Sequence, residues 1–294
     1  MSITYPEAIV IGALQGVTEL FPVSSLGHSI LVPAIVGGRW ARDLSVSTPE
    51  SPYLAFLVGL HVATALALLL FFWRDWVRII GGFFSSIRDR RVDSSDQRLA
   101  WLIVLATIPV GITGLLLEHT FRTVLGKPVP AAMFLLLNGV ILLIGERVRR
   151  RAALEPESGG GAAVAVDRRL SRVGYREGTL IGSAQILALL PGISRSGVTM
   201  IAGLGRGLSH TDAARFSFLL ATPVIFAAGV LKIPDLFGPL GSGIHGQVLA
   251  GSLAAFGCAY LAVRFLTRYF ETRTLVPFGL YCIAAGAVGL VLVA

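Results

Sequence analysis

The sequence predicts an all-α integral membrane protein, with about six transmembrane helices and two re-entrant helical hairpins arranged as inverted-topology repeats. Three observations support this prediction: the apolar composition, six long apolar runs, and two interrupted apolar stretches that resemble each other. Of the 294 residues, 54% are hydrophobic and 14% are charged, and the mean hydropathy is +0.75. So little charge cannot cover a water-soluble chain of this length, so we expect one membrane domain.

Six apolar runs have the length of a membrane span. A helix needs roughly 20 apolar residues to cross a hydrocarbon core of about 30 Å. Runs of about this length lie at 53–73, 99–117, 130–146, 212–231, 246–263 and 275–294. We expect each of them to cross the bilayer once.

Two further apolar stretches are each interrupted at a proline, Pro22 or Pro191. The pieces on either side are 7–21 and 24–37, and 178–190 and 194–205. Each piece reaches only about 20 Å as a helix, because the rise is about 1.5 Å per residue. We therefore expect two re-entrant hairpins whose irregular backbone lines a cavity. A single long span kinked by proline is the alternative interpretation.

The two interrupted stretches also share a pattern of residues. Gly12 and Gln15 precede the first break as Gly182 and Gln185 precede the second, and serines follow both prolines. We interpret residues 1–151 and 178–294 as two inverted repeats, each a hairpin followed by three spans. They are joined by a cytoplasmic connector at 152–177, whose composition cannot bury a core. Broken helices at matching positions of two halves indicate a buried binding site.

The net charge of +8 is distributed in a way that argues against a nucleic-acid partner. Arginines gather in alternate loops: six in 74–98, eight in 147–177, two in 206–215 and three in 264–273. By the positive-inside rule these loops are cytoplasmic, which places both termini outside. We therefore expect these arginines to lie beside membrane lipids, and we expect no nucleic-acid partner.

The first break gathers groups that can do chemistry. Gln15 and Glu19 are four residues apart and share one helical face. Ser24, Ser25 and His28 follow the break. A charge at the bilayer centre costs roughly 2.5–3.5 kcal/mol, so Glu19 indicates function. The alternatives are a structural hydrogen-bonding glutamate, serines that only cap a helix, and a packed histidine.

The second break has the residues of an anion site. Ser194, Arg195 and Ser196 begin a new helix, and Thr199 lies four residues after the arginine. Backbone N–H groups at a helix N-terminus attract anions, and a guanidinium matches phosphate oxygens. Because the substrate must reach a site walled by lipid-facing helices, we expect an amphiphile with a phosphate head group. The alternative is that Arg195 only pairs with Glu19 as a structural ion pair.

These residues resemble the undecaprenyl-diphosphate phosphatase family associated with bacitracin resistance. The two signatures are an (E/Q)xxxE helix running into PVSSxGH, here Gln15–His28, and PGxSRSxxT, here Pro191–Thr199; Phe216–Ala221 is similar to the next helix of the family. The resemblance covers nearly the whole chain. It implies hydrolysis of undecaprenyl diphosphate to undecaprenyl phosphate and inorganic phosphate, which recycles the lipid carrier for cell-wall synthesis. It also implies a bacterial plasma-membrane protein with a pocket open to the outer face, and often a homodimer.

We expect the site residues to divide into three roles. The expected catalytic residues are Glu19, Ser25, His28 and Arg195; the substrate contacts are Gln15, Ser24, Ser194, Arg195, Ser196 and Thr199; and the metal ligand is Glu19, for a divalent cation, Mg²⁺ or Ca²⁺. The nucleophile stays open between Ser25, which we rank first, His28 and a water molecule.

Two residues depart from the family pattern. Gln15 stands where many members have a first glutamate, which puts a two-carboxylate metal site in doubt, and His61 stands where many have glutamine. A transporter or flippase of isoprenoid phosphates is the alternative function, since broken helices in inverted repeats are a transporter architecture. A transporter needs the anion site but no nucleophile, so the serine, histidine and glutamate favour hydrolysis.

Overall fold

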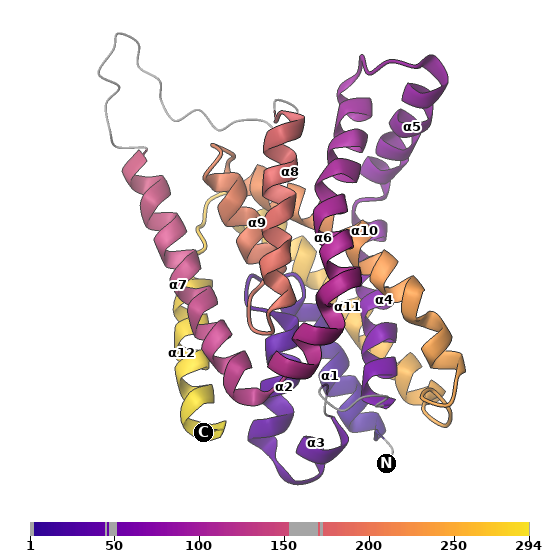
Figure 1. The fold of residues 1–294 in the computed structure, drawn as a ribbon, viewed down its shortest axis with the longest axis vertical. Helices are drawn as coiled ribbons and strands as arrows, with labels where there is room; N and C mark the ends of the chain where they lie inside the picture. The colour runs from indigo at the N-terminus through magenta and orange to yellow at the C-terminus, as the bar shows by residue number, and fades with distance from the viewer. Residues whose placement is uncertain (1–2, 45, 47–51, 153–169, 171–172, 294) are drawn as a thin grey trace.

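The structure of the chain, a computed structural model, is a bundle of helices (Figure 1). It describes residues 3–44, 46, 52–152, 170 and 173–293. No β-strand is assigned within these ranges. The α-helices are α1 (Tyr5–Thr18), α2 (Ser25–Val36), α3 (Gly38–Asp43), α4 (Pro52–Phe71), α5 (Trp73–Asp89), α6 (Ser95–Leu125), α7 (Pro128–Ala152), α8 (Tyr175–Ser183), α9 (Arg195–Leu204), α10 (His210–Phe237), α11 (His245–Tyr269) and α12 (Val276–Val293).

Six of these helices are long and apolar enough to cross a membrane: α4, α6, α7, α10, α11 and α12. Each of them covers all or nearly all of one of the six apolar runs of the sequence, so the prediction of an all-α membrane protein with six spans is confirmed. Their length follows from runs of apolar residues without a helix-ending signal. Pro109 and Pro223 lie inside α6 and α10 without ending them, which is common in spans because neighbouring groups satisfy the freed backbone.

The two interrupted stretches form pairs of short helices. The first runs from α1 through a turn at residues 19–24 into α2, and the second runs from α8 to α9. In Figure 1, α8 and α9 lie in the upper part of the molecule, and α1 and α2 lie in the lower part. The breaks therefore approach each other from opposite ends. That each pair enters and leaves the membrane on one side stays a prediction, as does the division into inverted repeats.

The second stretch is less regular than a plain helix up to residue 190. After α8 the chain tightens into a 3₁₀ helix at Ala184–Leu189, and Leu190 is extended, with φ −76° and ψ 121°. The steric cause is Pro191, whose ring disfavours a helical conformation at the preceding residue. Most of the predicted connector at 152–177 lies outside the described residues.

Two helices lie in segments that we expected to be loops. The shorter is α3 and the longer is α5, which follows α4 directly. Arginines at positions 74, 78 and 88 make α5 too polar to read as a span. Its buried face is narrow, formed by Ile79, Gly82 and Ser86, and it packs against α6.

Glycines bring several helices into close contact. A Cβ atom placed on Gly12 of α1 would lie 2.2 Å from the backbone oxygen of Gly251 in α11, and one on Gly139 of α7 would lie 2.5 Å from the oxygen of Gly279 in α12. Small residues at such crossings allow backbones to approach, which is how helices gain packing energy in lipid. The contact at Gly12 holds α1, and with it the first break, against α11.

Replacing Gly12 by alanine should therefore destabilise the fold. The added methyl group must displace backbone, which costs about 1–3 kcal/mol. Gly257 lies in α11, the helix that Gly12 contacts, but it faces open space. Gly257→Ala should therefore leave stability unchanged or raise it by up to about 1 kcal/mol. Thermal unfolding of both variants in detergent measures the difference; equal melting temperatures would contradict this packing.

Candidate functional site

The two breaks meet at an ion pair between Glu19 and Arg195. Arg195 Nη2 donates to Glu19 Oε1 at 2.6 Å across a sequence separation of 176 residues. The side chains are 7% and 13% exposed. Glu19 follows the last residue of α1, and Arg195 is the first residue of α9. The structure thus brings together the only acid of the first hairpin's break and the only arginine of the second, as the sequence predicted.

The second oxygen of Glu19 is surrounded by three more site residues. Gln15 Nε2 donates to Oε2 at 2.9 Å, and the Ser25 hydroxyl donates to the same oxygen. His61 Nε2 lies 3.8 Å away. A serine hydroxyl that donates to a carboxylate is placed to lose its proton to that carboxylate. Gln15 and His61, the two departures from the family pattern, therefore both lie at the site.

Ser24 joins the two breaks through its hydroxyl. The Ser24 Oγ accepts from the N–H of Gly27, which caps α2, and from the N–H of Gly192 in the other break, both at 3.2 Å. Gly192 has a φ of +114°, and a Cβ there would lie 2.4 Å from the backbone oxygen of Ala131. Only glycine suits both conditions. Ser24, predicted as a substrate contact, uses its side chain here to hold the scaffold.

The other predicted hydroxyl contacts also bind backbone. Ser194 caps α9 by accepting from the N–H of Gly197 at 3.2 Å. Ser196 Oγ donates to the backbone oxygen of Phe21 at 3.2 Å and lies 3.0 Å from Ser194 Oγ. Thr199 donates within its own helix, to the oxygen of Arg195 at 2.7 Å. These bonds lie beside the ion pair and fix the start of α9.

His28 points to a different neighbour. Its Nδ1 lies 2.7 Å from the backbone oxygen of Ser24, and its Nε2 lies 2.8 Å from the hydroxyl of Tyr281 on α12. Among the described side chains it makes no hydrogen bond to Glu19 or Arg195. His28 lies one helical turn after Ser25, and both of its ring nitrogens therefore already have hydrogen-bond partners.

Two residues at the site escaped the sequence analysis, Asn138 and Tyr281. Asn138 of α7 is fully buried; its Nδ2 donates to the backbone oxygen of Pro22 at 3.1 Å, and its Oδ1 accepts from the N–H of Ser194 at 3.0 Å. It thus clamps the two breaks together. The signal was available, because a lone asparagine inside an apolar span usually marks a hydrogen-bonding or functional position. Tyr281 carries no such signal.

The electrostatics of the site favour an anion beside the ion pair. Arg195 Nη1 is buried and has no hydrogen-bond partner among the described residues. Ser25 and Arg195, the first residues of α2 and α9, both bond to Glu19, so the N-termini of these helices, each with partial positive charge, lie close together. A buried guanidinium N–H without a partner carries a desolvation cost that a phosphate oxygen can remove.

The residues at the site suit a divalent cation only together with a ligand. The described residues contain no group of three or more histidine, cysteine, aspartate or glutamate side chains placed to hold a metal. Glu19 is the single carboxylate, and both of its oxygens already accept hydrogen bonds. A carboxylate retains lone pairs beyond these bonds, and Mg²⁺ commonly takes one or two carboxylates plus phosphate oxygens and water.

Comparison with known proteins shows the family of this chain. A protein from Mycolicibacterium paratuberculosis named undecaprenyl-diphosphatase is 69% identical over 299 residues, covering 98% of this chain and 97% of that protein. Undecaprenyl-diphosphatase 1 of Frankia casuarinae is 52% identical over 360 residues, with 97% of each chain covered. Undecaprenyl-diphosphatase 2 of Burkholderia lata is 46% identical over 280 residues, covering 95% of this chain and 93% of that protein. The family model of the bacitracin resistance protein BacA matches residues 8–288, so the chain belongs to the BacA family.

Proposed function

We propose that this chain hydrolyses undecaprenyl diphosphate to undecaprenyl phosphate and inorganic phosphate. The observation that carries the proposal is the state of Arg195: Nη2 binds Glu19 while the buried Nη1 has no partner among the described residues. One guanidinium can thereby position a carboxylate and bind a phosphate oxygen. The names and high identity of the relatives support the same activity.

The terminal phosphate is bound by charge and by backbone. Arg195 Nη1 and the N-termini of α2 and α9 bind its non-bridging oxygens, where charge gathers during phosphoryl transfer. Gln15 keeps the Glu19 carboxylate oriented. Ser24, Ser194, Ser196 and Thr199 contribute by fixing the backbone that binds the phosphate.

Ser25 is the nucleophile in the mechanism we favour. Its Oγ attacks the terminal phosphorus as its proton passes to Glu19, the bond to the bridging oxygen breaks, and undecaprenyl phosphate leaves with that oxygen. Water then attacks the phosphoserine, the bond between phosphorus and Oγ breaks, and Glu19 returns the proton to Ser25. Phosphate leaves with one proton of the water, and the other proton of the water is released to solvent. The bond from Ser25 to Glu19 supports this order.

His28 is the second candidate nucleophile. Its Nε2 is bound to Tyr281, so an attack by this atom would first require the exchange of a hydrogen-bond partner. His28 could instead donate a proton to the departing group. The geometry therefore ranks Ser25 ahead of His28.

A divalent cation, Mg²⁺ or Ca²⁺, belongs to the proposal as a partner of the substrate. Glu19 would be its protein ligand, and the diphosphate and water would supply the other oxygens. When bound, such an ion neutralises charge on the phosphate oxygens.

The cellular setting follows from the charge pattern and the family. The arginine-rich loops are on the cytoplasmic side, and we propose that the site opens toward the outer face of the bacterial plasma membrane, in a chain that pairs as a homodimer. There it recycles the lipid carrier of cell-wall synthesis. A flippase of isoprenoid phosphates would give the bond between Ser25 and Glu19 no role, so hydrolysis is preferred.

Phosphate release from undecaprenyl diphosphate in detergent tests the function. Arg195→Lys keeps the charge but loses the fork, and Glu19→Gln removes the base, so each should lower turnover by at least about 10²-fold. Arg206→Lys, an exposed arginine just beyond α9, is the matched control and should retain full activity. Turnover that survives both site substitutions would remove this site from consideration.

Trapping of the phosphorylated enzyme identifies the nucleophile. With terminally radiolabelled substrate, acid-quenched wild-type protein should carry acid-stable label at Ser25. Ser25→Ala should lose this label and at least about 10²-fold of the rate, whereas His28→Ala should keep the label. Acid-labile, base-stable label at His28 would instead assign the attack to the imidazole.

A further inference from the structure

A second cluster of charged residues lies at the start of α5, away from the Glu19–Arg195 pair. The apolar span α4 ends at Phe71 and α5 begins at Trp73. Beside this junction is an open cavity of about 650 Å³, lined by Phe71, Phe72, Trp73, Arg74, Asp75, Val77 and Arg78. The end of a span is the depth of the lipid head groups, and tryptophan and arginine are typical of that depth. The proposed reaction uses none of these residues.

The cavity carries excess positive charge in a fixed arrangement. Asp75 Oδ1 accepts from Arg78 and, at 2.8 Å, from Arg215 Nη2 of α10. One carboxylate thus holds two guanidinium groups side by side. The Arg74 guanidinium lies 5.4 Å from the centre of the Trp73 ring. Three arginines against one aspartate leave two positive charges unbalanced at the cavity.

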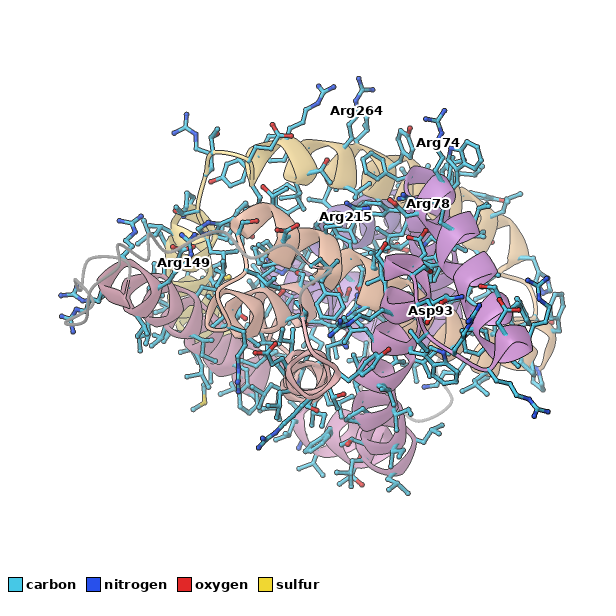
Figure 2. All side chains as sticks on the ribbon, turned by 90° about the horizontal axis from the view of Figure 1, so that it is seen from above. Arg74, Arg78, Asp93, Arg149, Arg215 and Arg264 are labelled. Atoms are coloured by element: carbon cyan, nitrogen blue, oxygen red, sulfur yellow. The ribbon has the colours of Figure 1, made fainter. Side chains whose placement is uncertain are left out.

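A further arginine, on another helix, lies on the same face. Figure 2 shows Arg74 and Arg78 close together in this view, with Arg215 and Arg264 in the same half of it and Arg149 at the opposite side. Arg264 of α11 is exposed. This end of the molecule bears the arginine-rich loops, which the positive-inside rule places at the cytoplasmic leaflet. Anionic lipids give that leaflet a negative surface potential, and basic pockets between helices bind their head groups.

An apolar row runs along α5 from the same cavity. Its five side chains recur every three or four residues and are all 49–65% exposed: Trp73, Val77, Ile80, Phe84 and Ile87. This spacing places them on one face of the helix. An apolar face flanked by arginine is the pattern of helices that contact the boundary between head groups and acyl chains.

We propose that this cavity binds the head group of an anionic phospholipid of the cytoplasmic leaflet. Arg74 and Arg78 bind the phosphate, with Asp75 holding both Arg78 and Arg215 in place, and an acyl chain lies along the exposed row of α5. A zwitterionic lipid is disfavoured because its ammonium group meets the unbalanced positive charge. The site is separate from the proposed hydrolysis, so its occupancy and catalysis can be measured independently.

Quenching of Trp73 by brominated lipids tests the proposal. Full-length protein is placed in phosphatidylcholine vesicles that contain increasing amounts of brominated phosphatidylglycerol, and the fluorescence that Trp73→Phe removes is followed. The mole fraction of brominated lipid needed for half-maximal quenching should be about tenfold lower for phosphatidylglycerol than for phosphatidylcholine. High salt should reduce this difference. This comparison uses the wild-type chain and Trp73→Phe, so it does not depend on arginine variants.

Paired variants locate the effect. Arg74→Gln with Arg78→Gln should abolish the preference, while phosphate release in phosphatidylcholine stays at the wild-type level. Arg88→Gln with Arg91→Gln, an equal change of charge at the other end of α5 where both arginines pair with neighbouring aspartates, should leave the preference intact. Equal quenching by both lipids, an equal loss in both double variants, or displacement of the lipid by inorganic phosphate would each overturn the proposal.

Discussion

The contact on which the rest of the site depends is the buried pair of Glu19 and Arg195. Removing two charges from water costs more than their attraction commonly returns, so a buried ion pair adds little net stability, although losing one partner is expensive. The pair is therefore better understood as a device that holds a carboxylate and a guanidinium at one point. The hydroxyl of Ser24 and the amide of Asn138 serve the same end, because each bonds to both breaks.

The hydroxyl groups around this pair are of two kinds: some bond to the backbone, and one bonds to a carboxylate. The hydroxyls of Ser24, Ser196 and Thr199 bind backbone groups, which satisfies the irregular backbone that two broken helices expose. Ser25 differs, because its hydroxyl donates to a carboxylate. In the proposed mechanism the hydroxyl of Ser25 is therefore the one that reacts, and Arg195 Nη1, which has no hydrogen-bond partner among the described residues, is available to the phosphate.

Much of this could be predicted from sequence because lipid imposes simple rules. Spans follow from apolar length, and Glu19 and Arg195 stood out because charge is costly at that depth. What escaped prediction depends on neighbours distant in the chain. The clamp at Asn138 and the contact from Tyr281 to His28 depend on how α7 and α12 pack. The sequence also does not predict which backbone groups the hydroxyls of Ser24 and Thr199 bond to. The helix α5 was missed because hydropathy alone does not distinguish an amphipathic helix from a charged loop.

Glu19 and Arg195 act as one unit that joins the two breaks. A double-mutant cycle on unfolding in detergent, with Glu19→Gln, Arg195→Gln and the combined variant, measures their coupling directly. Each single change leaves its partner buried and unpaired, so each should cost about 3 kcal/mol or more. The combined variant should cost little more than either, giving a coupling of about 2–3 kcal/mol. Strictly additive losses would contradict a shared site.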